Sequence, residues 1–485
     1  MTSSRFAAFY TITATLGLLG PGLRQTETQR EPYDLVLAGG RVLDPETGLD
    51  ADRNVGISGG RIAAVTIEAL AARETLDVRG LVVAPGFIDL HAHGQDSESY
   101  RYYAHDGVTT ALELEVGTYP VARWYDERAG HALINYGVTV GHPGARRAWM
   151  RHDQSLAGAT VLSDTSRSWT HRALPDAELP SLDSLVELGL GDGALGIGLG
   201  VQYTPGASRQ EIWGLFRIAA LHGVPCFVHL REGSVAGLQE VIADVATTGA
   251  SLHVVHITSM GLRDTPLLLD LVRGARARGL DVTTEAYPYT AASTGIQSAV
   301  FDPGWQQRLG IGYHDILYPP TGERLTRTRF QQLRRVGATV VFFMIPDSIV
   351  RLALADSLVM VASDGISPHG HPRLAGTHAR VLGRYVRDSS VLSLIDGVRK
   401  MTLLPAQRLE RVVPGMHAKG RVQVGADADL TIFDASRVID RATYERPAQF
   451  SEGIVHVLVG GTPVVRNGRS VDGVYPGRAV RRAGP

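Results

Sequence analysis

The chain has 485 residues, a formal net charge of −1 and one cysteine, Cys226. This length allows a large core and more than one domain. The balanced charge excludes proteins that bind nucleic acid or anionic membranes through a strongly basic surface, and the single cysteine excludes an intrachain disulfide.

The chain begins with a pattern typical of a targeting segment. Arg5 precedes the apolar stretch "FAAFYTITATLGLLG", which is too short to span a bilayer comfortably, and the polar "RQTETQRE" follows. We expect residues 1–25 to be a signal peptide and the protein to be exported, to the periplasm or out of the cell. The alternatives are an uncleaved anchor and a misassigned start codon, which would leave the protein cytoplasmic.

Two segments near opposite ends of the chain share one pattern. Residues 33–83 contain "YDLVLAGGRVLD" and "NVGISGGRIAAV", and residues 420–470 contain "GRVQVGADADLTIFD" and "VHVLVGGTPVVRNG". Both consist of short β-runs separated by Gly-Gly or Asn-Gly turns, and neither is long enough to form a good core alone. We expect residues 32–84 and 417–475 to pack together as one small β-sandwich domain.

The section between them, residues 85–416, alternates strand and helix patterns. "RQEIWGLFRIAALHG" and "TPLLLDLVRGARARG" have helical periodicity. The candidate strands are "GFIDLHAH", "VTTALELEV", "INYGVTVGH", "GALGIGLGV", "VPCFVHLRE", "SLHVVHIT", "LDVTTEAYPY" and "LVMVASDG". Eight strands alternating with helices predict an α/β fold, a (β/α)8 TIM-like barrel. An open doubly wound sheet is the alternative, but no glycine-rich phosphate fingerprint follows the first strand.

In such a barrel the functional residues lie at the C-terminal ends of the strands. The first strand ends with His91 and His93, whose spacing puts both imidazoles on one face of the strand. The other strands supply Glu113 and Glu115 from the second, His229 from the fifth, His256 from the sixth and Asp364 from the eighth. Histidines and carboxylates at one rim predict a zinc-type site.

Each of these residues alone also has an ordinary structural explanation. A histidine such as His229 or His256 is more often a core residue whose hydrogen bonds are satisfied. The pair Glu113 and Glu115 fits a solvated strand face, and Asp364 fits an Asp-Gly turn. The metal hypothesis therefore rests on separate strands that bring ligand types to the same place.

The chain resembles the amidohydrolase superfamily over about residues 33–470, and within it the N-acyl-D-amino-acid deacylase (D-aminoacylase) branch. The motifs that carry the resemblance are "PGFIDLHAH", "GVTVGHPGARR", "GALGIGLGVQYTPG", "FVHLRE", "VHIT", "YPYTA", "ASDGIS" and "HPRLAGTHARVLGRYVRD". The resemblance implies a hydrolase that uses one or two zinc ions, or other divalent metals, to cleave an amide bond.

The resemblance also implies roles at the matching positions. His91 and His93 would bind one metal ion, His229 and His256 would bind at a second site, and Asp364 would be both general base and metal ligand. The residues that would face the substrate are Tyr203, Arg231, Tyr289, Ser293 and Arg373. For Arg231, the alternative to a clamp on a substrate carboxylate is a structural ion pair with Glu232 or Glu240. For Tyr203 and Tyr289, the alternative is packing in a lid.

Two positions depart from the pattern of this branch. Its members typically have a cysteine ligand at the end of the second strand, where this chain has "TTALELEVG". They usually have a lysine two residues after the sixth-strand histidine, where this chain has Thr258. This second departure leaves the substrate class open.

The bridge between two metal ions must therefore come from another residue. The carboxylated lysine of other superfamily members is excluded, because the only lysines, Lys400 and Lys419, lie outside the predicted strand ends. A glutamate of the second strand remains, and Glu115 is preferred because it lies nearer the C-terminal end. Glu113 would lie one layer deeper, where it pairs with Arg231 or an inward histidine, or is itself the bridge.

The predicted reaction is attack of a metal-activated hydroxide on an amide carbonyl, with Asp364 passing the proton to the leaving nitrogen. N-acyl-D-amino acids or related peptides are the favoured substrates. The alternatives are the same chemistry on a cyclic amide, a lactone or a dipeptide, and a non-catalytic binding protein on a barrel. We expect a small-molecule partner, no nucleic acid and no membrane for the mature chain, and a homo-oligomer is an open alternative. Residues 143–180, rich in Arg, Trp and His, are expected to form an insertion near the mouth of the active site.

Overall fold

Eight strands form the central sheet of the computed structural model, which describes residues 7–8 and 32–482. All its neighbouring strands pair in parallel, and their order in the sheet follows the chain. The strands are β6 (Phe87–Asp89), β7 (Val108–Thr118), β8 (Asn135–Gly141), β9 (Ile197–Gly200), β10 (Pro225–His229), β11 (Ser251–Val254), β12 (Val282–Ala286) and β17 (Val359–Val361). Each of the eight predicted strands is present.

The sheet closes between its first and last strands. The amide of Asp364 donates to the carbonyl of His91 (2.8 Å), and Ala92 pairs with Gly365 in parallel. One oxygen of the buried Asp89 accepts from the amides of His91 and Ser363, each at 3.0 Å. The predicted (β/α)8 barrel is confirmed, and the open sheet is excluded. Closure brings the C-terminal ends of β6 and β17 together.

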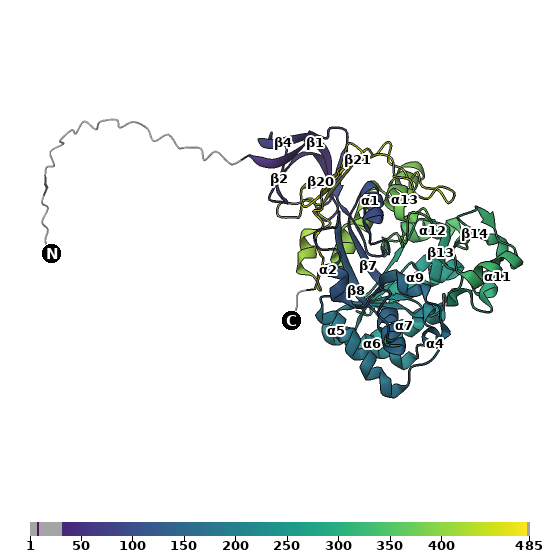
Figure 1. Cartoon of the computed structure of the whole chain (residues 1–485). Helices are drawn as coiled ribbons and strands as arrows, with labels where there is room; N and C mark the ends of the chain where they lie inside the picture. Colours follow the sequence, from purple (N-terminus) through teal and green to yellow (C-terminus); the bar gives the residue numbers. More distant parts are fainter. Residues whose placement is uncertain (1–6, 9–31, 483–485) are drawn as a thin grey trace, which may run out of the picture. The chain divides into compact units, whose positions relative to one another are not determined.

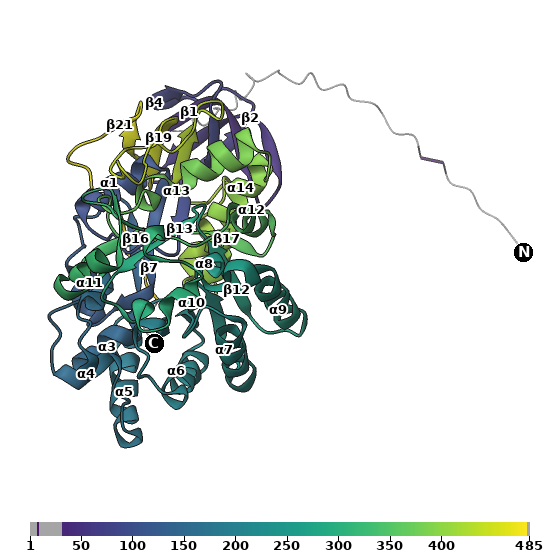
Figure 2. The same cartoon turned by 90° about the vertical axis from the view of Figure 1, so that its right-hand side faces the viewer.

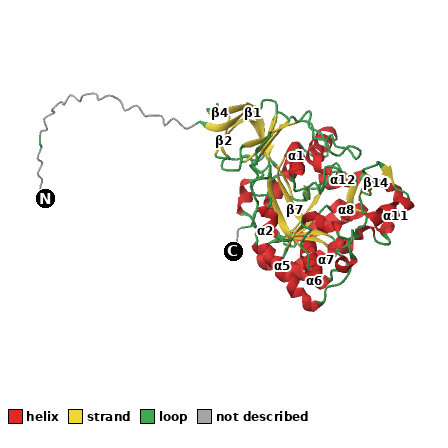
Figure 3. Ribbon diagram, viewed as in Figure 1, coloured by secondary structure: helices red, strands yellow, loops and turns green. Residues whose placement is uncertain are grey.

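Helices surround the barrel (Figure 3), and Figure 2 shows α5, α6, α7 and α9 side by side along one flank. They are α1 (Ser97–His105), α2 (Val121–Asp126), α3 (His142–Arg151), α4 (Arg167–Thr170), α5 (Leu179–Gly191), α6 (Arg209–His222), α7 (Val235–Thr248), α8 (Ile257–Gly261), α9 (Thr265–Ala277), α10 (Trp305–Leu309), α11 (Arg327–Val336), α12 (Asp347–Ala355), α13 (Arg373–Arg380), α14 (Leu394–Met401) and α15 (Leu403–Leu409). Helices α6 and α9 fall where helical periodicity predicts them. The Ser208 side chain caps α6 by accepting from the Glu211 amide (3.0 Å), and Gly223 ends it with a left-handed φ of 63°.

The two ends of the described chain build one further sheet. Its strands are β1 (Tyr33–Asp44), β2 (Leu49–Ser58), β3 (Arg61–Thr66), β4 (Ala72–Asp77), β5 (Val82–Pro85), β18 (Leu430–Phe433), β19 (Ile454–Val459), β20 (Thr462–Arg466) and β21 (Arg469–Ser470). The N- and C-terminal segments join where β5 pairs with β18, with Val83 opposite Ile432. Figure 1 shows the purple β1, β2 and β4 close to β20 and β21 of the C-terminal segment. A separate apolar cluster lies against this sheet, with members such as Leu37, Val55 and Ile432. The predicted sheet domain built from both termini is confirmed.

A third sheet, which the sequence analysis did not predict, is formed by the part of the chain that connects β12 to β17. Its strands are β13 (Ala291–Gly295), β14 (Ile316–Tyr318), β15 (Glu323–Arg324) and β16 (Thr339–Phe343), in the order β13-β16-β14-β15. Its own apolar cluster includes Phe301, Trp305 and Phe330. In Figure 1, β13, β14 and α11 of this segment lie close together. We call residues 291–344 the insertion.

Two predictions about the ends and borders of the chain stay predictions. The expected signal peptide, residues 1–25, lies outside the described residues apart from residues 7 and 8. Within the described part, none of the helices combines the length and the apolar character that crossing a membrane requires. The predicted borders of the sheet domain, 32–84 and 417–475, and of the barrel, 85–416, stay predictions.

The single cysteine, Cys226, is fully buried in β10.

Candidate metal centre and substrate cavity

Four predicted ligands meet where the barrel closes. The Nε2 atoms of His91 and His93 lie 3.1 Å apart, and each lies 3.0 Å from Oε2 of Glu115. Oδ1 of Asp364 lies 3.5 Å from the first of these nitrogens and 3.4 Å from the second. We call these four residues the first pocket. Strands β6, β7 and β17 supply them, in the manner expected of strand ends in a barrel.

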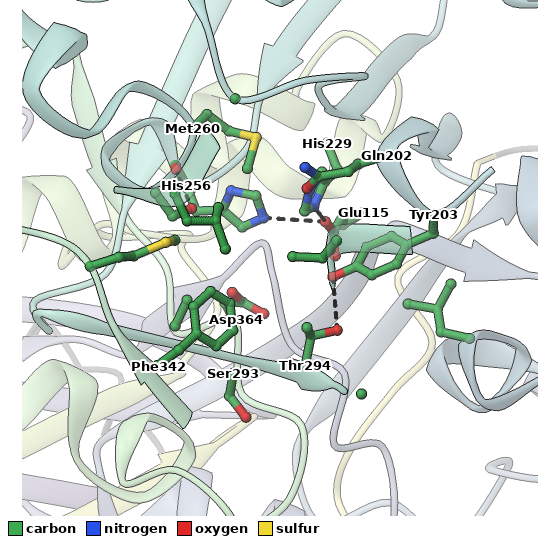
Figure 4. Close-up of a pocket in the computed structure, with 18 of the residues that line it drawn as sticks. Glu115, Gln202, Tyr203, His229, His256, Met260, Ser293, Thr294, Phe342 and Asp364 are labelled. Carbon is green, nitrogen blue, oxygen red and sulfur yellow. Dashed lines mark hydrogen bonds and ion pairs between the residues drawn. The ribbon is translucent and has the colours of Figure 1, made fainter. Parts of the chain in front are cut away.

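The second oxygen of Glu115 belongs to another set of ligands. Oε1 lies 2.6 Å from Nδ1 of His229 and 3.2 Å from Nε2 of His256. We call Glu115, His229 and His256 the second pocket. Figure 4 shows both imidazoles pointing toward the Glu115 carboxylate. In each pocket the donor atoms lie within 4.8 Å of one another, and the two pockets share one carboxylate. The preference for Glu115 as the shared ligand agrees with this geometry.

The outer nitrogens of the first-pocket histidines indicate that a cation fits between them. Nδ1 of His91 lies 2.6 Å from Glu285, and Nδ1 of His93 lies 2.7 Å from Glu113. A carboxylate behind an imidazole favours the tautomer with its proton on that nitrogen, which leaves Nε2 as the atom that can bind a cation. Two Nε2 atoms 3.1 Å apart are stable side by side only with positive charge between or beside them, either a proton or a metal ion. The donor set of imidazoles and carboxylates suits zinc.

The charges around His91 also favour a positive charge in the first pocket. Burial by itself lowers the pKa of His91, but the carboxylates of Asp364, Glu115 and Glu285 outweigh it and raise that pKa to about 10. For Glu115, burial alone would raise the pKa, and the surrounding histidines hold it well below its usual value. The pocket is therefore strongly selective for positive charge.

Glu113 is in neither pocket, which corrects its inclusion among the predicted metal ligands. Its Oε2 contacts the outer nitrogen of His93, and its Oε1 accepts from the amides of Val116 and Gly117, each at 3.3 Å. Glu113 is thus the deeper of the two glutamates and pairs with an inward histidine. It orients a ligand and does not face the space between the pockets.

Asp364 is held in place by Arg373. The Arg373 Nη2 donates to Oδ1 (2.9 Å), and Nη1 lies 2.8 Å from Oδ2. Burial by itself raises the pKa of Asp364, but Arg373 and the nearby histidines hold it well below its usual value. Asp364 and His256 both have left-handed backbone, with φ of 55° and 32°. Residues other than glycine rarely adopt it, and such strain collects at functional sites.

A cavity of about 380 Å³ opens in front of the two pockets (Figure 4). One wall, the barrel wall, consists of residues at strand ends: His93, Glu115, His229, His256 and Asp364. The opposite wall, the insertion wall, comes from the insertion and from the segment after α3. Its apolar members include Leu162, Val300, Leu309, Phe342 and Met344. Ala159, Leu162 and Ser163, in the segment 143–180, are among the residues that line the cavity. The bounds of that segment as an insertion stay a prediction.

The predicted substrate residues divide into two groups. Tyr203 and Ser293 line the cavity, and the Tyr203 hydroxyl lies 3.2 Å from Thr294 Oγ1. Arg231 and Tyr289 are not among the described residues that line it. The guanidinium of Arg231 donates to Glu240 (2.9–3.1 Å) and to the Ala207 carbonyl (2.7 Å), as in the structural alternative.

Tyr287 lines the cavity where Tyr289 was expected. The Tyr287 hydroxyl is buried and has no hydrogen-bond partner among the described residues, whereas that of Tyr289 donates to the Pro372 carbonyl (3.4 Å). Arg373, which was also expected to face the substrate, is not among the described residues that line this cavity. It is 1% exposed, pairs with Asp364 and lines only a smaller side cavity of about 190 Å³.

Sequence analysis missed the buried residues behind the first pocket. Glu285 on β12 contacts His91 and also lies 3.1 Å from Nε2 of His253 on β11. Nδ1 of His253 lies 2.8 Å from Thr283 Oγ1. The only available signal was the polar residues in the otherwise apolar runs "SLHVV" and "VTTEA".

Two segments at the mouth are joined by one carboxylate. Asp302, in the insertion, lies 2.7 Å from Nε2 of His171, which follows α4. The other oxygen accepts from Arg334 Nη2 at 3.0 Å, and Arg334 is on α11. Asp302 thus ties the segment after α3 to the insertion.

The chain matches the Amidohydrolase family over residues 165–465. It is 32% identical to the D-aminoacylase of Alcaligenes xylosoxydans xylosoxydans, in a match that covers 94% of this chain and 99% of that protein. It is 33% identical to the N-acyl-D-glutamate deacylase of the same organism, with 93% and 97% covered.

Among solved structures, the N-acyl-D-glutamate deacylase from Bordetella bronchiseptica has a TM-score of 0.78 and 28% identity, with 93% of this chain and 100% of that chain covered. That structure is a complex with zinc and a phosphonate inhibitor, a mimic of the tetrahedral intermediate of the reaction. The family match and the nearly complete coverage agree with the barrel and with the clustered ligands. The chain belongs to the amidohydrolase family.

Proposed function

We propose that this protein is a zinc-dependent hydrolase of N-acyl-D-amino acids, which converts its substrate and water into a carboxylic acid and a free D-amino acid. The observation that carries the proposal is one buried carboxylate, Glu115, placed between two sets of histidines beside Asp364. The chain is similar to deacylases of this substrate class over almost its whole length.

The residues of the two pockets have distinct parts in the proposed reaction. His91, His93, Glu115 and Asp364 would hold one ion, and Glu115, His229 and His256 a second. A divalent ion supplies Lewis-acid chemistry, which polarises a carbonyl oxygen and makes water nucleophilic near neutral pH. Asp364, kept ionised by Arg373, accepts the proton of the attacking water and passes it to the leaving nitrogen.

The insertion wall favours substrates whose acyl group or side chain is apolar. Arg308 is the only arginine or lysine among the described residues that line the cavity. Its guanidinium donates to the backbone carbonyls of Val300, Asp302 and Pro303 (2.9–3.2 Å). The other residues of the insertion wall that line the cavity include the apolar Leu162, Leu309 and Met344. An acidic side chain would lose hydration here without gaining a free cationic partner.

Activity and metal content, measured together, test this function. Protein stripped of metal and then reconstituted with zinc is assayed with N-acetyl derivatives of D- and L-methionine, D-leucine and D-glutamate, and with a cyclic amide. We expect activity only with metal, on the D-derivatives, and at least about tenfold higher kcat/KM for the apolar side chains than for D-glutamate. Turnover of the cyclic amide alone would refute the deacylase assignment.

Export of the protein is a proposal from the sequence alone. The pattern of Arg5 followed by a short apolar stretch supports removal of residues up to about 25. Mass spectrometry of protein from its native host measures the mature N-terminus. A chain that begins at Met1 or Thr2 in a cytosolic fraction would contradict the proposal.

A further inference from the structure

A separate cavity, of about 280 Å³, opens at the end of the barrel opposite the metal centre. Asp281 and Ser357, which line it, come just before the strands β12 and β17, whereas the metal ligands lie near the C-terminal ends of their strands. We call it the basal cavity. Its other lining residues are Arg276 on α9, Thr283 on β12, Leu358 and Met360 at β17, Leu404, Gln407 and Arg408 on α15, and Arg411 after α15.

Arg408 is the buried cation of the basal cavity, with 8% of its surface exposed. Its Nη1 donates to the two oxygens of Asp281, at 3.1 and 3.0 Å. Its Nε and Nη2 form another edge of the same planar group. Both atoms are buried, and among the described residues they have no hydrogen-bond partner. A guanidinium keeps its charge in proteins, and its buried donors require acceptors.

The same edge of two other arginines shows which group fits it. Nε and Nη2 of Arg41 donate to the two oxygens of Asp50, at 2.6 and 2.8 Å. Those of Arg421 donate to the two oxygens of Glu46, at 2.8 and 2.7 Å. This edge thus takes two oxygens of one anion, in a fork geometry that suits carboxylate and phosphate. The matching edge of Arg408 is therefore a prepared site for an oxyanion.

The charges of the basal cavity favour an anion with two negative charges. Three arginines and one aspartate line it, so its wall has two positive charges in excess. Arg276 and Arg411 are exposed and Arg408 is buried, so the positive charge extends from the mouth to the interior. Burial by itself raises the pKa of Asp281, but Arg408, Ser251 and Arg411 hold it below its usual value. Asp281 is therefore ionised and already paired.

The remaining side chains of the basal cavity suit the same ligand. Thr283, Ser357 and Gln407 bring hydroxyl and amide groups, which can donate to the oxygens of an anion. Leu358 and Leu404 are apolar and offer a surface to a short alkyl group attached to the anion.

We propose that the basal cavity binds a phosphate group, either as inorganic phosphate or as a small phosphate monoester, on the Nε and Nη2 edge of Arg408. The bound group accepts two hydrogen bonds from this edge, and Arg276 and Arg411 balance its remaining charge at the mouth. The site goes beyond the proposed hydrolase function and does not depend on it, because the basal cavity shares no lining residue with the substrate cavity or the metal pockets.

Isothermal titration calorimetry of the zinc-loaded protein, freed of excess zinc, tests the site. At about pH 7.5 inorganic phosphate and ethyl phosphate are mostly dianions, and the tighter of the two identifies the form that the cavity takes. Acetate, with one negative charge, should bind more weakly than either. We expect Arg408→Gln to weaken phosphate binding at least about tenfold. Arg408→Lys keeps the charge without the planar fork and should also weaken it.

Two exposed arginines provide a matched pair of variants that leaves the interior of the protein intact. Arg411 lines the mouth of the basal cavity, whereas Arg335 is on α11 and does not line it. We expect Arg411→Gln to weaken phosphate binding about fivefold and Arg335→Gln to leave it unchanged. This pair tests the proposal even if the Arg408 variants do not fold.

Four outcomes overturn the proposal. If the wild-type protein binds no phosphate, the basal cavity holds only water. If Arg408→Gln and Arg411→Gln bind phosphate as the wild type does, and phosphate inhibits hydrolysis competitively, the anion lies at the metal centre. Equal losses in Arg411→Gln and Arg335→Gln would show a general effect of surface charge. Full affinity in Arg408→Lys would show that the fork of Arg408 does not hold the anion.

Discussion

The barrel wall and the insertion wall of the cavity are built in opposite ways. On the barrel wall, residues such as His93 and Glu115 have their orientation fixed by charged or polar partners. On the insertion wall, Leu162, Leu309 and Met344 are half-buried apolar side chains on segments between strands. The contrast indicates that the rigid strand ends supply the chemistry, and we expect the segments between strands to set the selectivity.

The largest effect should come from the shared carboxylate of the barrel wall. Glu115→Gln keeps the shape and removes the charge that faces both pockets. We expect loss of the second ion and a fall in kcat of about 10³-fold, more than the roughly 10- to 100-fold that follows loss of a group that only orients a ligand. Elemental analysis and kcat measure the two effects.

Glu113→Gln and Cys226→Ser are the controls for this variant. The first should weaken metal binding only as an orienting residue does, and the second should leave metal content unchanged, because the Cys226 thiol is in neither pocket. Loss of metal in the cysteine variant alone would reject the shared-carboxylate arrangement.

On the insertion wall, Met344→Ala should change selectivity. The substitution shortens an apolar side chain that faces the cavity. We expect kcat/KM for N-acetyl-D-methionine to fall about tenfold, while N-acetylglycine, which has no side chain to place there, is hydrolysed as before. Steady-state kinetics on both substrates measure the difference. Equal losses on the two would mean that Met344 supports the fold of the wall and does not contact substrate.

Asp302→Asn should loosen the insertion wall without touching the barrel wall. The charge of Asp302 holds His171 and Arg334, in contacts that are partly exposed. Such pairs are worth up to about 1 kcal/mol, so we expect a rise in KM of about fivefold and little change in kcat. If kcat falls and KM does not, the Asp302 contacts affect the chemical step, and the division between the two walls is wrong.

The smallest effect on activity should come from His105, which belongs to neither wall. Burial and the neighbouring Arg101 lower the pKa of His105 to about 4, and its Nε2 lies 2.9 Å from Ser470 Oγ. Between pH 6.5 and pH 4 the unfolded chain binds a proton there that the folded chain does not. The free energy of unfolding should therefore fall by up to about 3 kcal/mol as the pH is lowered through this window.

His105→Gln removes the titrating group and should flatten this part of the pH dependence. Urea unfolding at pH 7 and pH 4.5 measures it, with kcat at pH 7 as the check that the cavity is unaffected. An unchanged slope would show that other groups cause the loss of stability in acid.

The barrel wall could be predicted because its geometry follows from the strand pattern. Once eight strands were assigned, their C-terminal ends had to meet, and the alternation along β7 placed Glu115 one layer above Glu113. The same logic placed His229, His256 and Asp364. The sequence did not show that Glu285 and His253 lie behind His91, because both lie inside their strands and not at the C-terminal ends where the barrel places functional residues.

The insertion wall could not be predicted for two physical reasons. Its strands are as short as the two residues of β15, Glu323–Arg324, and carry no readable alternation. Beyond the end of β12 at Ala286 the regular pleat stops, so spacing could not tell whether Tyr287 or Tyr289 faces the cavity. For Arg231, the sequence offered both a substrate and Glu240 as partners, and only the tertiary fold decides between them.

The single thiol of Cys226 has a practical consequence for labelling the insertion with fluorescent dyes. Burial in β10 raises its pKa, so a maleimide dye should leave it unmodified in the folded protein. Cysteines placed at Val336 on α11 and Leu221 on α6, whose native side chains are 79% and 78% exposed, would then be the only reactive sites. A fluorescent donor and acceptor at these positions would report the distance between the insertion and the barrel during turnover, without removal of any native residue that lines the cavity.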